Sequence, residues 1–501
     1  MRILIKNGLL ITLDAQNHIY AGHDLLVEDG VITRLGRGIS PAGVQADKVI
    51  DASDRLVVPG WVDAHVHSYD AYTKGLYEGA PLETWFPYAN MSVRRPLTQR
   101  ELYVRTLLTA TEMLRSGVTT GYDAVTLAPL NTESVDTLMT AYRDLGLRGV
   151  VSISLLNKPL TPSMPYLDEI MPADVRAKAD AGTIPPDAEL IGFCRWMIDK
   201  WNGKDGCLHV ALAPSAPQRC TDRFMALMDD LSREKRVPWH THVLETKVQA
   251  VTGREFYGKT IVEHLAELGL LSDRLALDHG VWLNDHDMQL LAQAGTSVVH
   301  NPISNLKVAS GIAAVRQMLQ AGVNVALGTD NAGGVDTASM FETLKFAALL
   351  QEVVSPEFAV WEPAREVVRM ATAGGAKCVL MQETIGSLEV GKRADLVLYD
   401  LNSHPFVPLN DPILQLVYSE NGQSVDTVLV NGRVIMENKR ILTVDEQAIL
   451  EEAQAIGLSL QPEHEKARQF AEPLQPYLKA MYRRCVEQDV GINRFSGIGS
   501  K

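Results

Sequence analysis

Two histidines separated by one residue give the strongest chemical signal in the sequence. His65 and His67 follow the apolar run Leu56–Val62. In a strand, residues i and i+2 point to the same side, so both imidazoles would project together from the end of this strand. A pair of this kind can also be two polar surface histidines, but the apolar run favours a buried strand. Two buried imidazoles need a partner, and a metal ion provides one.

Histidines or carboxylates also lie at the ends of several other apolar runs. Imidazole and carboxylate ligands together suit Zn²⁺, Fe²⁺ or Mn²⁺. The five cysteines form no Cys-x-x-Cys pair, which argues against a purely structural zinc site. The sequence therefore predicts a divalent metal site of the catalytic kind. The additional candidate residues are His240, His242, Glu245, His279, His300 and Asp330.

Eight apolar, strand-like runs alternate with helix-like stretches in the middle of the chain. This alternation predicts a parallel (β/α)8 TIM-like barrel, an α/β fold whose chemistry lies at the carboxyl ends of the strands. An open doubly wound sheet is the alternative. A capping box at Thr98 and Glu101 predicts one of the helices, ending at Ser116. The predicted strands are 57–66, 117–121, 149–155, 208–213, 237–244, 275–281, 296–301 and 323–329.

The two ends of the chain share a second texture. Residues 1–58 and 385–442 hold short β-rich runs broken by Asn-Gly and Asp-Gly pairs, which suit tight hairpins. We expect these two segments to build one small sheet domain. The barrel would then occupy residues 59–384, and residues 443–501 would form a helical extension that covers one side of the protein.

Composition and charge exclude several classes of protein. The chain has 501 residues, 46% of them hydrophobic and 22% charged, which is typical of a globular protein. Its formal net charge of −14 argues against nonspecific binding to nucleic acid or to an anionic membrane. The N-terminus has the pattern of a strand and not of a signal peptide. No apolar run is long enough to span a membrane. The few scattered cysteines suit a reducing compartment. We expect a soluble cytoplasmic protein.

Two long segments lack a regular pattern. Residues 68–97 are rich in aromatic side chains, Trp85 among them, and residues 156–190 are rich in proline. Long loops in compact domains often line or cover a site. Residues 253–260 fit the spacing of a phosphate-binding loop, but a polar, helix-like stretch precedes them in place of an apolar strand. We interpret these residues as a helix start.

Several motifs together resemble the amidohydrolase superfamily. They are PGWVDAHVH, SGVTTGYD, HTHVLET, LDHGV, HNPISNLKVASG, NVALGTD and GSLEVGKRADLVLYD, and the match spans about residues 1–442. The chain is most similar to the chlorohydrolase/aminohydrolase branch, which includes triazine hydrolases, guanine deaminases and S-adenosylhomocysteine/methylthioadenosine deaminases. The resemblance implies that the small sheet domain built from both chain ends is a β-sandwich.

The resemblance implies roles for individual residues. His65, His67, His242 and Asp330 would bind one divalent metal, with Zn²⁺ the first choice and Fe²⁺ or Mn²⁺ the alternatives. Asp330 would also accept a proton from the attacking water, His279 would hydrogen-bond that water, and Glu245 would carry a proton to the substrate. The substrate contacts would come from Trp85, His300 and Asn305.

The residues leave rival assignments open. His240 shares a strand face with His242 and is the alternative ligand, whereas the family spacing of three residues before Glu245 favours His242. Glu245 could instead be a carboxylate at a helix N-terminus, and His279 could be a core histidine.

The reaction implied by the resemblance is hydrolytic deamination of an amino-substituted nitrogen heterocycle such as a purine, pterin, pyrimidine or triazine. The sequence departs from the family at residues 331–339, where deaminases of this branch carry a Ser-Asn-Asn-Asp-like segment, and this weakens the expectation of a nucleoside. Amide or urea cleavage and dechlorination are alternatives at the same site, and a non-catalytic scaffold is the minor one. The expected partners are a small heterocyclic substrate and further copies of the chain, in a homodimer or larger assembly.

Overall fold

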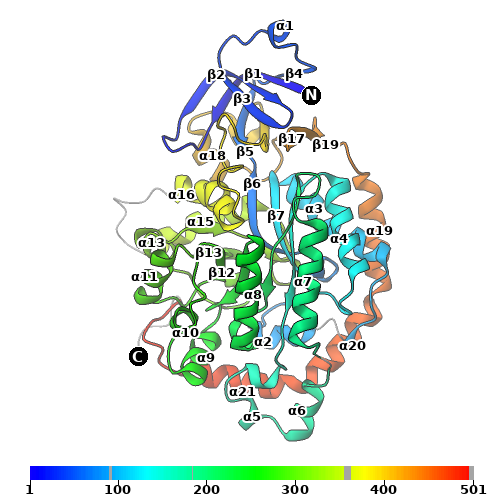
Figure 1. The fold of residues 1–501 in the computed structure, drawn as a ribbon, viewed down its shortest axis with the longest axis vertical. Helices are drawn as coiled ribbons and strands as arrows, with labels where there is room; N and C mark the ends of the chain where they lie inside the picture. The colour runs from blue at the N-terminus through cyan, green and yellow to red at the C-terminus, as the bar shows by residue number, and fades with distance from the viewer. Residues whose placement is uncertain (90–92, 183, 355–362, 496–501) are drawn as a thin grey trace.

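A ring of parallel strands forms the centre of the molecule. The structure is a computed structural model, and it describes residues 1–89, 93–182, 184–354 and 363–495. Two parallel sheets of six and four strands make up the ring (Figure 1). Their strands are β6 (Trp61–His67), β7 (Val118–Val125), β8 (Arg148–Leu155), β9 (Leu208–Val210), β10 (Ala213–Pro214), β11 (Trp239–Val243), β12 (Leu275–His279), β13 (Ser297–His300), β14 (Val325–Leu327) and β15 (Asp330–Asn331).

Backbone contacts close the two sheets into a barrel. On one side, Leu212 bridges to Trp239 in parallel, and the amide of His240 donates to the carbonyl of Leu212 at 2.9 Å. On the other side, β15 follows β14 directly and pairs with β6, with Asp330 opposite Val66. The closed ring confirms the predicted barrel and excludes the open doubly wound sheet. All eight predicted strand regions contribute to it.

The predicted strand 57–66 is wrong as a single element. The structure divides it at Gly60 into β5 (Arg55–Pro59), which pairs with the strand β16 (Leu396–Asp400) outside the barrel, and β6 inside it. A Cβ atom at Gly60 would lie 2.1 Å from the Thr119 side chain. Glycine therefore allows the chain to pass close to β7 while it changes from one sheet to the other.

Both ends of the chain build the sheet at the top of Figure 1. Hydrogen bonds join its strands into one nine-stranded sheet in the order β19-β18-β17-β16-β5-β1-β2-β3, with β4 beside β1. One buried cluster contains Ile3 and Leu25 from the N-terminal part and Leu396 and Leu429 from the C-terminal part. A division of this sheet into two packed layers stays a prediction. The strands not yet bounded are β1 (Arg2–Ile11), β2 (Ile19–Glu28), β3 (Val31–Gly36), β4 (Lys48–Asp51), β17 (Val425–Val430), β18 (Arg433–Glu437) and β19 (Arg440–Ile441).

Helices surround the barrel, and the capping signals in the sequence place two of them correctly. Helix α3 (Gln99–Arg115) begins with the predicted capping box. Helix α9 (Lys247–Tyr257) ends at Gly258, and Thr260 caps α10 (Ile261–Glu267), which confirms a helix start where the phosphate-loop spacing occurs. The other main helices are α4 (Thr132–Leu145), α7 (Asp187–Trp201), α8 (Asp222–Lys235), α11 (Asp285–Ala294), α12 (Pro302–Lys307), α13 (Val315–Gln320), α15 (Met340–Val353), α16 (Pro363–Arg369), α17 (Gly375–Cys378) and α18 (Pro412–Tyr418).

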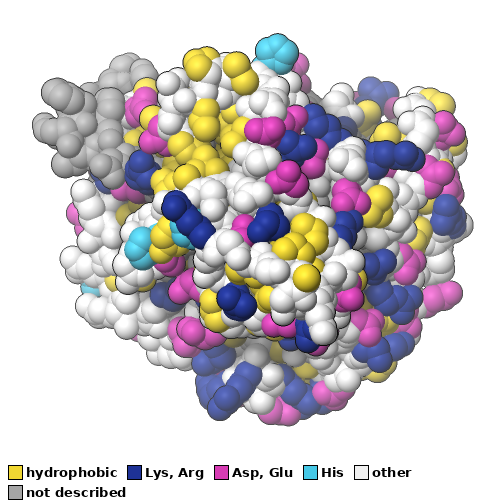
Figure 2. Space-filling model, turned by 90° about the horizontal axis from the view of Figure 1, so that it is seen from above, with side chains coloured by type: hydrophobic (Ala, Val, Ile, Leu, Met, Phe, Trp, Pro, Cys, Tyr) yellow, Lys and Arg dark blue, Asp and Glu magenta, His cyan; other side chains and the backbone are white. Residues whose placement is uncertain are grey.

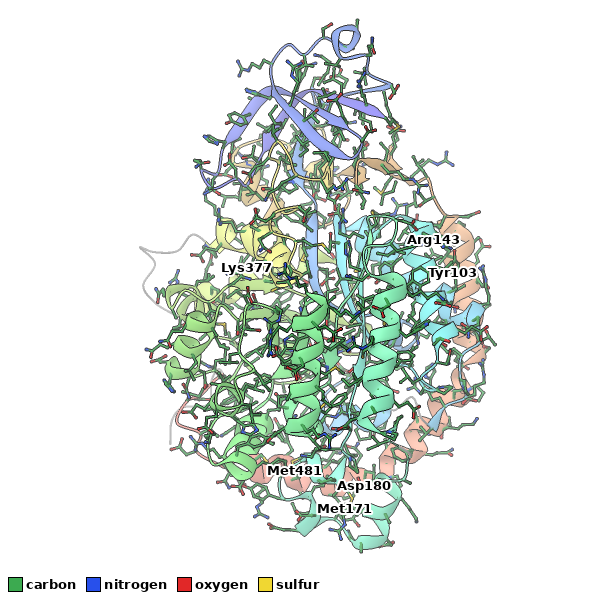
Figure 3. The ribbon with its side chains drawn as sticks, in the orientation of Figure 1. Tyr103, Arg143, Met171, Asp180, Lys377 and Met481 are labelled. Carbon is green, nitrogen blue, oxygen red and sulfur yellow. The ribbon has the colours of Figure 1, made fainter. Side chains whose placement is uncertain are left out.

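The predicted C-terminal extension is helical, and it runs along the barrel to the end that lies opposite the nine-stranded sheet (Figure 1). It consists of α19 (Glu446–Ser459), α20 (Gln461–Ala471) and α21 (Gln475–Val486). Met481 of α21 shares a buried cluster with Met171, and Figure 3 shows both side chains at this end. Helix α21 therefore packs on the loop that follows β8.

The face of the molecule shown in Figure 2 has no large patch of only positive or only negative charge. Figure 2 looks onto the nine-stranded sheet, and basic and acidic side chains are interspersed there. Among the described helices, none has both the length and the apolar character of a membrane span. All five cysteines are free thiols.

Candidate metal centre

Two imidazoles from different strands face each other at the carboxyl end of the barrel. The Nε2 atoms of His67 and His242 lie 3.3 Å apart. Their Nδ1 atoms contact the carbonyl oxygens of Ala124 and Ser215 at 2.5 and 2.7 Å. A carbonyl only accepts, so each Nδ1 carries a proton, and burial lowers the pKa of His67 to about 4 and of His242 to about 3. Two neutral rings thus direct lone pairs at the same point, where a cation would be stabilised.

His65 and Asp330 complete this cluster. The Nε2 atoms of His65 and His67 each lie 3.5 Å from Oδ1 of Asp330. Both ring nitrogens of His65 are buried and have no hydrogen-bond partner. The ligand atoms of His65, His67 and His242 all lie within 4.8 Å of one another, a spacing that could hold a metal ion. Because buried polar atoms are almost always satisfied, the orphaned nitrogens fit a metal-binding role.

The alternative ligand His240 points elsewhere. Its Nδ1 lies 3.2 Å from Oδ1 of Asp278, and its ring stacks on Tyr122 at 3.8 Å between centroids. The same Asp278 oxygen lies 3.3 Å from Nδ1 of His65. His240 therefore belongs to a neighbouring group with His65 and Asp278, and His242 is the histidine that the fold places against His67.

Glu245 and His279 lie together beside the cluster. Nε2 of His279 is 3.7 Å from Oε2 of Glu245 and 3.8 Å from Oδ2 of Asp330. Burial and the carboxylates of Asp330 and Glu83 raise the pKa of Glu245 well above its usual value. Nδ1 of His279 lies 2.9 Å from Oδ1 of Asn305, so Asn305 orients this ring. The site thus contains a carboxyl group whose surroundings favour its protonated form.

The backbone turns sharply where these side chains leave the strands. Leu244, His279 and Asp330 have φ values of 53°, 74° and 67°. Residues other than glycine rarely adopt this left-handed region, and such residues concentrate at functional sites. The strain is consistent with side chains that must turn inward at the end of a strand.

Two of the predicted substrate contacts, one of them in the aromatic loop of residues 68–97, are buried side chains. Trp85 belongs to α2 (Leu82–Trp85) and is buried, and a Cβ atom at Gly333 would lie 3.4 Å from its ring. His300 ends β13 and is also buried, with no hydrogen-bond partner for either ring nitrogen. The third predicted substrate contact, Asn305, is buried as well. Contact of any of the three with a substrate stays a prediction.

Three residues of the site were not identified from the sequence. Asp278 precedes His279 in an apolar strand. It lies two residues after Ala276, which faces the inside of the barrel, so strand alternation could have predicted that Asp278 also faces inward. Glu83 receives a hydrogen bond from Thr246 at 2.5 Å, and no pattern in the loop marked it. Ser215 acts through its backbone carbonyl, which a side-chain pattern cannot reveal.

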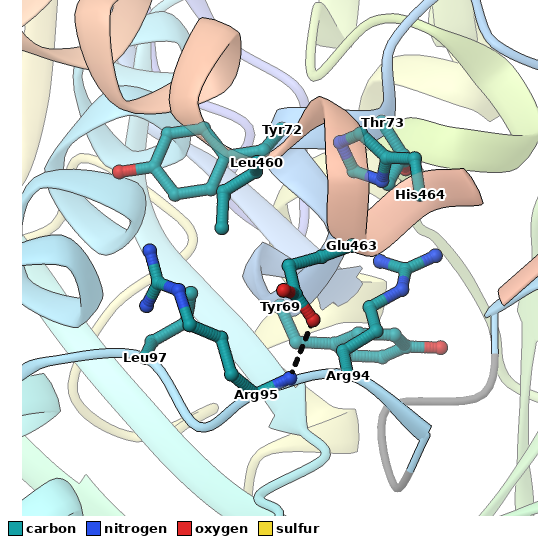
Figure 4. A pocket seen from close by; sticks show the side chains of 9 residues that line it. All are labelled: Tyr69, Tyr72, Thr73, Arg94, Arg95, Leu97, Leu460, Glu463 and His464. Carbon is teal, nitrogen blue, oxygen red and sulfur yellow. Dashed lines mark hydrogen bonds between the residues drawn. The ribbon is translucent and has the colours of Figure 1, made fainter. Parts of the chain in front are cut away.

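The C-terminal helices hold the aromatic loop in place. The amide of Gln475 in α21 donates to the carbonyl of Thr84 at 2.8 Å. Figure 4 shows a small cavity between the loop and α20, where Glu463 accepts from the backbone amide of Arg95 at 2.8 Å. Tyr69 lines this cavity, and its ring lies 5.2 Å from the ring of His67. The extension thus packs against the wall of the metal centre.

Comparisons with known proteins point to a single family. The Amidohydrolase family matches residues 56–435. A 5-methylthioadenosine/S-adenosylhomocysteine deaminase from Caldanaerobacter subterraneus is 34% identical over 455 residues, which cover 91% of this chain and 97% of that protein. A 5′-deoxyadenosine deaminase from Methanosarcina barkeri is 33% identical over 455 residues, covering 90% of this chain and 96% of that protein.

Solved structures agree. A triazine hydrolase from Arthrobacter aurescens superposes with a TM-score of 0.81 at 25% identity, over 91% of this chain and 99% of that one. An adenosine deaminase from Xanthomonas campestris with bound zinc superposes with a TM-score of 0.78 at 27% identity, over 93% and 98%. The family match covers most of the sequence. The barrel carries its histidines at the strand ends where the sequence motifs place them. This chain therefore belongs to the amidohydrolase family.

Proposed function

We propose that this protein is a metal-dependent hydrolase that removes the amino group of an amino-substituted nitrogen heterocycle and releases ammonia. The observation that carries the proposal is the pair of facing Nε2 atoms of His67 and His242, whose other nitrogens already donate to carbonyls. The names of the relatives, which are adenosine-type deaminases, support the deamination of a ring.

His65, His67, His242 and Asp330 would hold one divalent metal ion, for which we propose zinc. The zinc in the Xanthomonas structure and the mixture of imidazole and carboxylate ligands support this choice, with Fe²⁺ and Mn²⁺ as alternatives. When bound, such an ion supplies a water molecule whose pKa falls from 15.7 to about 7.

The remaining side chains would manage protons. Burial raises the pKa of the Glu245 carboxyl well above its usual value, which favours its protonated form. In that form Glu245 would donate to a ring nitrogen or to the departing amine. Asp330 would accept the proton of the attacking water. His279, held by Asn305, would stabilise the charge that develops on that water. Trp85 and His300 would form the walls against a planar ring, because aromatic side chains suit a flat ligand.

We also propose the predicted domain division, with residues 1–58 and 385–442 in the small domain, 59–384 in the barrel and 443–501 in the extension. The buried cluster shared by both chain ends supports the first of these. A homodimer or larger assembly remains our proposal. The exposed apolar side chains of Phe346, Leu349 and Val353 on α15 support it, and light scattering on the purified protein would test it.

The first experiment joins two measurements on protein purified without chelators. Elemental analysis would give the metal content, and an ammonia assay would screen adenosines, other aminopurines, pterins, aminopyrimidines and triazines. About one metal per chain with ammonia from any of these rings is the expected result. Metal without ammonia would shift the function to amide cleavage or dechlorination, and no metal after reconstitution would leave a scaffold.

A further inference from the structure

Arg219 lies beside the metal centre and has no carboxylate partner among the described residues. It ends the short helix η5 (Pro217–Arg219), which follows the barrel strand β10. Its Nη1 donates to Oγ of Ser215 at 3.0 Å, and no described carboxylate lies within ion-pair distance of the guanidinium. The backbone oxygen of the same Ser215 contacts His242. One residue therefore connects this arginine to the metal-site histidine.

An aromatic ring fixes the guanidinium in this position. Its central carbon lies 4.4 Å from the centroid of Phe86, which follows Trp85 in the aromatic loop. Such stacking restrains the plane of the guanidinium and leaves its edge free to donate. Phe86 and Ser215 together hold the guanidinium, and the carbonyl of Ser215 also contacts the metal-site residue His242.

The physical chemistry of this group calls for an anion. A guanidinium has five N–H donors and stays charged in proteins, and even partial withdrawal from water, as for the half-buried Arg219, is unfavourable without a counter-charge. Burial lowers the pKa of Arg219, and no carboxylate opposes that effect. The Arg219 nitrogens that have no hydrogen-bond partner are not fully enclosed by the protein. These donors are therefore accessible to a ligand.

We propose that Arg219 binds an anionic group of the substrate, a carboxylate or a phosphate, while the heterocycle lies at the metal centre. This inference rests on the proposed deamination and adds to it the charge of the substrate. The fork of a guanidinium matches both kinds of anion through paired hydrogen bonds. Neutral heterocycles would then be poorer substrates than the same rings with an acidic group.

Three compounds that differ at one position would test the proposal. They are adenosine-5′-carboxylic acid, its neutral carboxamide and adenosine 5′-monophosphate. We would measure kcat/KM for each at fixed ionic strength on the zinc-loaded wild type, Arg219→Gln and Arg219→Lys. Arg223→Gln is the matched control, because Arg223 is exposed on α8 only four residues away. Metal content and melting temperature of every variant would show that it is folded.

We expect the wild type to prefer at least one acidic compound over the carboxamide by about tenfold to hundredfold, the range for hydrogen bonds to charged groups. Which acid it prefers separates carboxylate from phosphate. Arg219→Gln should lose the preference and leave the carboxamide nearly unchanged, Arg219→Lys should retain part of it, and Arg223→Gln should retain all of it. Equal values for all three compounds in the wild type, or an equal loss for all three in Arg219→Gln, would overturn the proposal while deamination stands.

If the wild type releases ammonia from none of the three, the proposed action on adenosines fails. Titration calorimetry with the same compounds then decides the anion site alone. Tighter binding of an acid than of the carboxamide, lost in Arg219→Gln, would support it. Equal or absent binding of the acids would contradict it.

Discussion

The two ends of the barrel treat buried charge in opposite ways. At the end that meets the nine-stranded sheet, Arg148 donates from Nε and Nη2 to both oxygens of Asp395 at 2.8 and 3.0 Å, and both side chains are almost fully buried. At the other end, the Nε2 atoms of His67 and His242 face each other at 3.3 Å, and the half-buried Arg219 meets no described carboxylate. The buried charges of Arg148 and Asp395 pair with each other, whereas Arg219 at the other end has no such opposite charge beside it among the described residues.

This difference separates residues that stabilise the fold from residues that serve the site. A buried ion pair is worth little net stability, but the loss of one partner is costly because it leaves the other charge alone. An unpaired buried group lowers stability from the start, and a protein that retains such a group uses it for another purpose. Substitutions at the two ends should therefore affect different measurements.

The largest effect should come from His242. His242→Ala should lose the bound metal and all hydrolysis, because it removes one of the two facing lone pairs. We expect metal affinity to fall by more than about 100-fold, the upper range for loss of a supporting partner alone. His240→Ala is the matched control, because His240 faces Asp278. Its metal affinity should fall by less than about 100-fold. A His242→Ala protein with full metal content and full activity would remove His242 from the ligand set.

Glu245→Gln should separate proton transfer from metal binding. The amide keeps the size of the side chain but cannot donate the carboxyl proton, so kcat should fall by about 10² to 10⁴. Metal content and melting temperature should stay near those of the wild type. Turnover close to normal, measured by ammonia release, would mean that Glu245 is not the proton carrier.

At the opposite end, Arg148→Met should affect stability and leave the chemistry unchanged. It leaves the buried Asp395 unpaired, and we expect the free energy of unfolding to fall by about 3–5 kcal/mol. The double variant with Asp395→Leu should recover much of this loss. Arg195→Met breaks the exposed pair with Glu234 and should cost no more than about 1 kcal/mol. Denaturant titration would measure all three, and equal losses from the buried and exposed pairs would contradict the comparison.

The smallest expected effect is the pH dependence contributed by Glu83. Burial raises the pKa of this carboxyl to about 7, against 4.5 in the unfolded chain. The folded state therefore binds the proton more tightly, and stability falls as the pH rises from about 4.5 through 7, by up to about 3 kcal/mol. Glu83→Gln should remove this slope and be more stable than the wild type at pH 8 but not at pH 4.5. Glu133→Gln, at an exposed position on α4, should show the same dependence of stability on pH as the wild type. If the curve of Glu83→Gln also runs parallel to that of the wild type, Glu83 is not the source of the slope.

The sequence predicted the barrel and its strand ends well because both depend on local patterns. Apolar runs mark the strands, and a polar residue that ends such a run marks the edge where parallel strands meet, as at Asp330. The break at Gly60 was missed because it arises from the approach of Thr119, a contact that no local pattern records. Alternation alone places His240 and His242 on the same face. The family spacing to Glu245 favours His242, and the position of Asp278 on the next strand shows where His240 points.

Side chains that act across the fold were beyond the reach of the sequence. Glu83 is buried because Thr246 and α21 lie over its loop, although these elements are far away in the chain. Arg219 is significant because no described carboxylate pairs with it, and its neighbours are known only once distant segments have been placed. The paired and unpaired charges that distinguish the two barrel ends are thus a property of tertiary structure.

The sheet that both chain ends share has a consequence for biosynthesis. Arg55 of β5 bonds to Asp400 of β16, a residue 345 positions later in the chain. At a synthesis rate of about 5–20 residues per second, the ribosome needs roughly 17–70 s to deliver that partner. Throughout this interval the edge of β5 has no neighbour to pair with on that side, and the apolar residues around it are not yet covered. Folding of the small domain is therefore a late event in synthesis, and a nascent chain that stalls before β16 would be exposed to aggregation and to chaperones.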